Sequence, residues 1–130
     1  MEFKDKICIV TGGANGIGKN IVKDFIKFGA KVCFIDMDKE NGMKLCENYN
    51  DEILFFHGDI SKEETLNEFY KIVISKYEKI DYLINNACLT KGGILSGCTY
   101  DDFNYVFKIG VTAPYMLTKL LWKTLMKREP

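Results

Sequence analysis

Tyr115 and Lys119 stand four residues apart in the segment YMLTK, so on a helix they would share one face. A lysine beside a tyrosine lowers the tyrosine pKa, because the positive charge favours the phenolate. A tyrosine of this kind can act as a general acid or base on an alcohol or a carbonyl. The pair is a candidate for chemistry, and the elements around it decide whether it is well placed.

A glycine-rich turn, TGGANGIG at 11–18, is the second candidate. Gly12, Gly16 and Gly18 allow a tight turn and close approach of a pyrophosphate to the backbone. The helix that begins near Gly16 would offer free N–H groups and the positive end of its dipole to that anion. The spacing is not G-x-G-x-x-G, and a tight turn without a ligand is the alternative.

Asp36 ends an apolar run, KVCFID, about 20 residues after that turn. A carboxylate at this place accepts hydrogen bonds from both hydroxyls of an adenosine ribose and repels a 2′-phosphate. The alternative role is a helix cap, for which Asp38 competes, and this competition leaves Asp36 freer for the ribose. No basic residue stands at Asn15, although Lys39 is near, so the pattern favours NAD over NADP.

Four apolar runs alternate with segments of helical periodicity. The runs are KICIVTG, KVCFID, EILFFHGD and IDYLINN. Strands that alternate with helices call for a parallel sheet with helices on both faces and right-handed crossovers. The sequence therefore predicts a Rossmann-like, doubly wound α/β sheet with the strand order 3-2-1-4.

The predicted helices have boundary signals. Ser61 and Glu64 form the pattern S-x-x-E of a capping box. Thr99 or its neighbours open a helical region through Lys127, which is expected to restart near Pro114. The first helix should stop at Gly29, and its apolar stripe is Ile17, Ile21, Val22, Phe25, Ile26 and Phe28.

Composition excludes several other classes. The 130 residues hold 18 basic and 18 acidic side chains, and Arg128 is the one arginine, so nucleic acid is not an expected partner. The lone His57 and the absence of a C-x-x-C pair leave no zinc spacing, and no metal is expected. No signal peptide or membrane span is seen. Reduced thiols in the cytoplasm are the simplest interpretation of Cys8, Cys33, Cys46, Cys88 and Cys98.

Five segments in order resemble the short-chain dehydrogenase/reductase family. They are TGGANGIG at 11–18, Asp36, GDI at 58–60, NNAC at 85–88 and GVTAP at 110–114. The resemblance implies an NAD(P)-dependent oxidoreductase that transfers hydride between nicotinamide and a small alcohol or carbonyl substrate. It implies cofactor contacts from Thr11, Gly12, Asn15, Gly16, Ile17, Gly18, Asp36, Met37, Asp59, Ile60, Asn86, Ala87 and Cys88.

The implied roles differ along the cofactor. Asp36 and Met37 would contact the adenosine ribose and adenine, and the Asp59 side chain would lie near the adenine amino group. Asn85 is expected to tie neighbouring strands together instead. His57 on the third strand is expected to be a packed or edge histidine with no functional role.

Two residues depart from the family pattern. Cys88 stands where the family usually has glycine, and it is either a redox-active thiolate or, more simply, a small buried thiol. Gly110 stands where the family has an asparagine that helps to hold a water of the proton relay. A glycine has no side chain for that task, so another group or water replaces the asparagine, or the relay is absent.

The opening pair stands at the wrong place for the family's catalytic residues. There, a substrate-positioning serine on a fifth strand precedes Y-x-x-x-K, whereas Tyr115 and Lys119 directly follow GVTAP. The pair is therefore interpreted as a decoy, and no catalytic residue is assigned. Apolar surface for the sheet, and for a second subunit, is the alternative use of Tyr115, Leu117, Leu121, Trp122 and Leu125.

Residues 1–130 are thus expected to be the N-terminal, NAD-binding half of a Rossmann-type domain, truncated before the later strands and without a second domain. Such a chain alone would be inactive, and a non-catalytic NAD-binding module or an inactive remnant is the alternative function. Homo-oligomers are expected through the 112–127 helix or through the exposed edge of the fourth strand.

Overall fold

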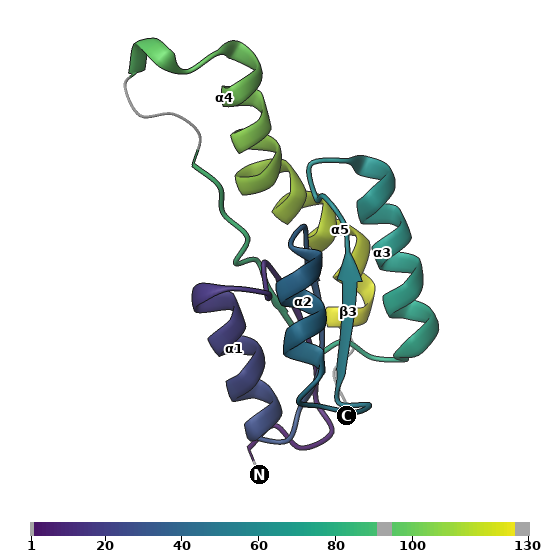
Figure 1. The fold of residues 1–130 in the computed structure, drawn as a ribbon. Coiled ribbons are helices and arrows are strands. Elements are labelled where there is room, and N and C mark those ends of the chain that lie inside the picture. The colour runs from purple at the N-terminus through teal and green to yellow at the C-terminus, as the bar shows by residue number, and fades with distance from the viewer. Residues whose placement is uncertain (1, 91–94, 127–130) are drawn as a thin grey trace.

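A parallel sheet between two layers of helices forms the protein (Figure 1). The computed structural model describes residues 2–90 and 95–126. The order across the sheet is β3-β2-β1-β4, which confirms the predicted order and fold class. The strands are β1 (Ile7–Thr11), β2 (Lys31–Asp36), β3 (Ile53–His57) and β4 (Tyr82–Ile84).

Helices cover both faces of the sheet. In Figure 1, α1 and α2 lie to the left of β3, α3 lies to its right, α5 passes behind it, and α4 projects past the upper end of the strands. The bounds are α1 (Gly16–Lys27), α2 (Lys39–Cys46), α3 (Glu63–Lys76), α4 (Tyr100–Phe107) and α5 (Ala113–Leu125), with short turns η1 (Leu95–Gly97) and η2 (Lys108–Thr112). Within residues 2–90 and 95–126, each helix is too short or too polar to span a lipid bilayer.

Alternating side chains of the strands pack into two separate hydrophobic cores, one on each face of the sheet. Cys8 and Val10 of β1 pack toward α1 and α2, whereas Ile9 packs toward α3 and α5. All three side chains are fully buried, which is why the first strand is a continuous apolar run rather than an alternating one. Burial on both faces fixes the register of the inner strands, because a slip by one residue would exchange the two cores.

The segment from α4 to α5 follows the predicted restart. Thr99 caps α4 through a reciprocal capping box with Asp102, at 3.0 and 3.2 Å. The π-helical turn η2 separates α4 from α5, and Pro114 lies in the first turn of α5, where its missing N–H removes no helical bond. Lys127, the last residue of the predicted helix, lies outside the described residues, as do residues 91–94 of the predicted loop.

Three local predictions were wrong. Lys62 rather than Ser61 precedes α3, and the Ser61 N–H donates to the Asp59 carboxylate at 2.9 Å, so the expected capping box does not form. Ile17, in the first turn of α1, is 75% exposed, so its side chain does not belong to the core. Phe28 follows the end of α1 and is 41% exposed, with its ring edge against Phe3.

Two glycines give opposite expectations for the same substitution. An alanine Cβ at Gly42 in α2 would come within 2.3 Å of the Phe55 ring, which stacks on Phe34. Gly42→Ala should therefore destabilise the fold by about 1–3 kcal/mol. At Gly110 in η2 a Cβ meets nothing within 4 Å, so Gly110→Ala should stabilise it by about 0.5–1 kcal/mol. Urea unfolding of the two variants measures both changes, and equal signs would contradict this packing.

Candidate functional site

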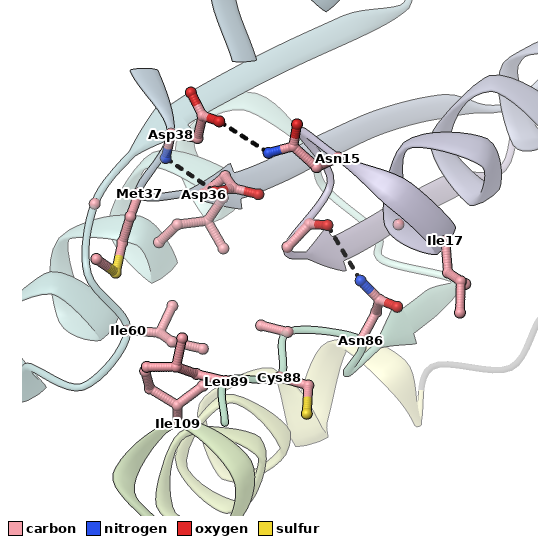
Figure 2. Close-up of a pocket in the computed structure, with 15 residues that line it drawn as sticks. Asn15, Ile17, Asp36, Met37, Asp38, Ile60, Asn86, Cys88, Leu89 and Ile109 are labelled. Atoms are coloured by element: carbon pink, nitrogen blue, oxygen red, sulfur yellow. Dashed lines mark hydrogen bonds between the residues drawn. The ribbon is translucent and has the colours of Figure 1, made fainter. Parts of the chain in front are cut away.

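A cavity of about 470 Å³ opens at the carboxyl ends of β1, β2 and β4 (Figure 2). This is the edge at which parallel α/β sheets bind ligands. The lining residues come from five segments that are far apart in the chain. They are Gly12, Asn15, Ile17, Gly18, Ile35, Asp36, Met37, Asp38, Gly58, Ile60, Asn86, Ala87, Cys88, Leu89 and Ile109.

The glycine turn forms one wall and requires glycine at three places. Gly12 and Gly16 have positive φ angles of 72° and 55°. A Cβ at Gly18 would lie 2.0 Å from the carbonyl oxygen of Gly12, so only glycine lets α1 start this close to the turn. A Cβ at Gly16 would meet nothing within 4 Å, which leaves open space above the start of the helix.

The start of α1 is suited to an anion. Asn15 is its N-cap residue, yet the Asn15 side chain makes no capping hydrogen bond, and no acidic residue stands in the first turn. The N–H groups of that turn have no partner within the helix, and the helix dipole adds positive potential there. A bound phosphate would satisfy both, which is the arrangement that the glycine pattern predicts.

Two aspartates hold the opposite rim. The Asp36 carboxylate accepts the N–H of Ala14 at 3.0 Å and the N–H of Asp38 at 2.9 Å, one on each oxygen. Asp38 caps α2 by accepting the N–H of Asn41 at 3.0 Å, as predicted. Each oxygen of Asp36 thus already accepts one backbone hydrogen bond, which the sequence did not predict. Each oxygen also keeps a second acceptor position, and two ribose hydroxyls would need these two positions.

Asn86 and Thr11 join β1 to the chain beyond β4. The Asn86 amide donates to the carbonyl oxygens of Thr11 and Gly12, both at 3.1 Å. The Thr11 hydroxyl accepts the N–H groups of Asn86 and Ala87 at 3.1 and 2.9 Å. The linking role that the sequence predicted for Asn85 belongs to Asn86, because the amide after β4 that faces β1 is that of Asn86, whereas Asn85 is exposed.

Comparison with known proteins decides the family. The family model for the short chain dehydrogenases matches residues 6–130. The chain belongs to the short-chain dehydrogenase family. It is 34% identical over 123 residues to "Short chain aldehyde dehydrogenase 1" of Euphorbia lathyris, covering 91% of this chain and 42% of that protein.

Solved structures of the family have the same fold. An apo SCOR enzyme from Clostridium thermocellum shares 41% identity at a TM-score of 0.86, over 92% of this chain and 49% of that one. The 3-ketoacyl-(acyl-carrier-protein) reductase of Brucella melitensis, solved with NADH, shares 29% identity at a TM-score of 0.86, over 94% and 50%. The chain spans about half the length of the relatives it matches.

The residues that the family resemblance singled out lie on this cavity, with three exceptions. Thr11 is buried behind the turn, Gly16 lies outside the lining, and the Asp59 carboxylate is directed elsewhere. Asp59 accepts the N–H of Ser61 and the hydroxyl of Tyr105, the latter at 3.3 Å. Burial and then the charge of Asp59 raise the pKa of Tyr105, so this hydroxyl stays protonated.

Cys88 lines the cavity and is exposed, so the prediction of a small buried thiol was wrong.

The cavity has five further lining residues that the sequence analysis did not name as cofactor contacts. Ile109 could have been noticed as the apolar residue beside Gly110, and Leu89 as the residue that follows NNAC. These residues are Ile35, Asp38, Gly58, Leu89 and Ile109.

Tyr115 and Lys119 lie away from this cavity. They share a shallow groove on the outer face of α5 with Pro114, Thr118 and Trp122, and none of these residues lines the cavity. His57 lies at the end of the edge strand β3, where its ring contacts the Met37 carbonyl oxygen at 3.0 Å. No group of side chains that could hold a metal occurs among the described residues.

The two adjacent asparagines make a matched pair of variants. Asn86→Ala removes both hydrogen bonds to the glycine turn and leaves two carbonyl groups without this donor, so it should cost about 2–3 kcal/mol of unfolding free energy. Asn86→Asp should cost more, because a carboxylate cannot donate and would face two carbonyl oxygens. Asn85→Ala should change stability by less than about 0.5 kcal/mol. Thermal unfolding checks the order, and equal effects at the two positions would contradict the assignment.

Proposed function

We propose that this chain binds NAD in the cavity at the carboxyl edge of the sheet. Residues 1–130 would then serve as the N-terminal, nucleotide-binding half of an oxidoreductase. The reaction would be hydride transfer between nicotinamide and a small alcohol or carbonyl compound, which is the chemistry the cofactor supplies when it is bound. The observation that carries the proposal is the meeting of an uncapped helix start, an open glycine turn and the Asp36 carboxylate in one cavity.

Each part of the cavity has a task in this proposal. The N–H groups at the start of α1 would bind the diphosphate, and Gly12 and Gly18 keep side chains out of its way. Asp36 would accept the ribose hydroxyls, and Ile60 and Ile109 offer apolar surface for the adenine ring. Ala87 and Cys88, beyond β4, would lie beside the nicotinamide half.

The preference for NAD over NADP is part of the proposal. The cavity lining has two carboxylates, and it contains no lysine, arginine or histidine among the described residues. A 2′-phosphate beside Asp36 would therefore meet repulsion without a compensating cation. The relative solved with NADH is consistent with a nicotinamide cofactor here, and it supports the proposal at that coarser level.

The state of the cysteines supports a proposal for the cellular compartment of the protein. Burial raises the pKa of Cys8 and of Cys33 to about 12, which keeps both as unreactive thiols. The described cysteines are all free, which suits a reducing compartment such as the cytoplasm. We assign the chain to that compartment, with a small molecule rather than a nucleic acid as its substrate.

Self-association through α5 completes the proposal. The outer face of α4, η2 and α5 carries a stripe of large apolar side chains that are 49–81% exposed. Tyr115 and Trp122 are 65% and 55% exposed, whereas Leu117 and Leu121 on the inner face are buried. The members of this outer stripe are Tyr100, Phe103, Phe107, Val111, Tyr115, Trp122 and Met126. A patch of this kind marks a contact surface, for which we propose a second copy of the chain.

The cofactor proposal predicts different effects at the cavity and at the groove. Asp36→Asn should weaken NADH binding about tenfold or more, because the ribose loses a charged acceptor. Tyr115→Phe and Lys119→Met should leave the affinity within about twofold, since both residues lie outside the cavity. Calorimetric titration with NADH measures all three. A loss of binding in the Lys119 variant would show that the decoy interpretation is wrong.

The association proposal predicts that Trp122→Gln weakens self-association about tenfold or more, because a large buried aromatic ring carries much of such an interface. Lys123→Gln, at the next position of the same helix, is the matched control and should change it little. Sedimentation equilibrium gives both dissociation constants. A wild-type chain that stays monomeric at the highest attainable concentration would contradict this assignment.

A further inference from the structure

Asp38 was predicted only as a helix cap, yet its carboxylate stands on the rim of the cavity beside Asp36. We propose that Asp38, held in place by Asn15, is a second determinant that excludes a 2′-phosphate, so that selectivity for NAD rests on two carboxylates. This inference rests on the proposed function, because it concerns which dinucleotide the same cavity accepts.

The position of Asp38 is fixed by a small hydrogen-bond network. Its backbone N–H donates to Asp36 at 2.9 Å, which places the two aspartates side by side. One carboxylate oxygen accepts the side-chain amides of Asn15 and Asn41, at 2.9 and 2.7 Å. The other oxygen accepts the N–H of Asn41. Figure 2 shows the Asn15 amide and the Asp38 carboxylate facing each other across the rim.

The Asn15–Asp38 bond joins the glycine turn to the start of α2. Asp36 lies between these two segments, because it receives one N–H from Ala14 of the turn and one from Asp38. If Asp36 binds the ribose, a phosphate on the ribose 2′-oxygen would have to fit between the same two segments. The bond also directs an amide N–H of Asn15, an uncharged donor that a phosphate could otherwise use, toward a carboxylate. The network thus commits one N–H of this amide to Asp38 and places a second carboxylate between the glycine turn and α2.

The charge of Asp38 acts in the same direction. Hydrogen bonds from the Asn41 backbone, and then from the Asn15 and Asn41 side chains, hold the pKa of Asp38 below its usual range, so the group is ionised at neutral pH. Lys39 follows it in the chain but is exposed and does not line the cavity. A 2′-phosphate would therefore be repelled by Asp38 even if the charge of Asp36 were removed.

Asp38→Asn tests the inference without removing the helix cap. Asparagine is as good an N-cap as aspartate, so the variant removes the charge and keeps the acceptor of the Asn41 N–H. Glu47→Gln is a matched charge control at the far end of α2, beyond a Debye length of about 8 Å at physiological salt. Asp38→Ser, a second capping residue without charge, should reproduce the result.

The quantity to measure is the ratio of the dissociation constants of NADPH and NADH, obtained by calorimetry for the whole chain. Asp38→Asn should lower this ratio about five- to tenfold at low salt, and the effect should shrink as salt is added, because a charge effect at an exposed rim is screened. Asp36→Asn combined with Asp38→Asn should lower the ratio further than Asp36→Asn alone. Glu47→Gln should leave the ratio unchanged.

The outcomes separate this inference from the function on which it rests. If NADH binds the wild type but Asp38→Asn leaves the ratio unchanged, Asp38 is only a helix cap and the inference is wrong, while the proposed function stands. If the effect does not depend on salt, the charge is not its cause and the inference is equally overturned. If neither dinucleotide binds the wild type, the proposed function fails and takes the inference with it.

Discussion

The N–H groups in the first turn of an α-helix have no partners within the helix, and this constraint organises the carboxyl edge of the sheet. In α1 no acidic side chain of the first turn and no capping bond from Asn15 supplies a partner. Gly18 brings the helix start against the carbonyl oxygen of Gly12, and Asn86 fastens that turn to the chain beyond β4. The polar groups near the turn thus support a place for an anion and do not fill it.

The rest of the fold serves this arrangement. Parallel strands buried on both faces bring their carboxyl ends to one edge, so residues from distant segments meet there. Because β1 and β2 carry apolar side chains on both faces, their register is strongly specified, and the distance from Ala14 to Asp36 is fixed with it. The selectivity that we assign to Asp36 and Asp38 is therefore a consequence of strand packing as much as of charge.

The sequence was sufficient for the elements and for their order. Continuous apolar runs and helical periodicity are strong signals, and the glycines and Asp36 mark the edge where a ligand belongs. The directions of the side chains were harder to predict from the sequence, because they depend on contacts between segments that are far apart in the chain. Nothing in NNAC tells which asparagine faces β1, and nothing in GDI tells that Tyr105, from a helix far along the chain, takes the carboxylate of Asp59. Ile17 matched the apolar period of α1, but that period cannot show that its side chain lines the cavity and stays exposed.

Tyr115 and Lys119 illustrate the same limit for chemistry. Their spacing is right for an acid/base pair, but a spacing of four along any helix brings two residues together, and only the position of the helix relative to the cavity decides their use. Here the pair faces outward from α5, and the buried Leu117 and Leu121 of that helix meet the sheet. The residues that line the cavity come instead from β2, the start of α1, η2 and the segments after β1, β2, β3 and β4.

The most direct measurement of the central claim is a titration of the ¹⁵N-labelled chain with ADP-ribose, followed through its backbone amide resonances. A diphosphate bound at the start of α1 should shift the amides from Gly12 to Gly18 first and most strongly, and those of Asp36 and Met37 with them. Amides of the outer face of α5 should not move. Unchanged resonances in the glycine turn at saturating ligand, or shifts confined to α5, would contradict the account.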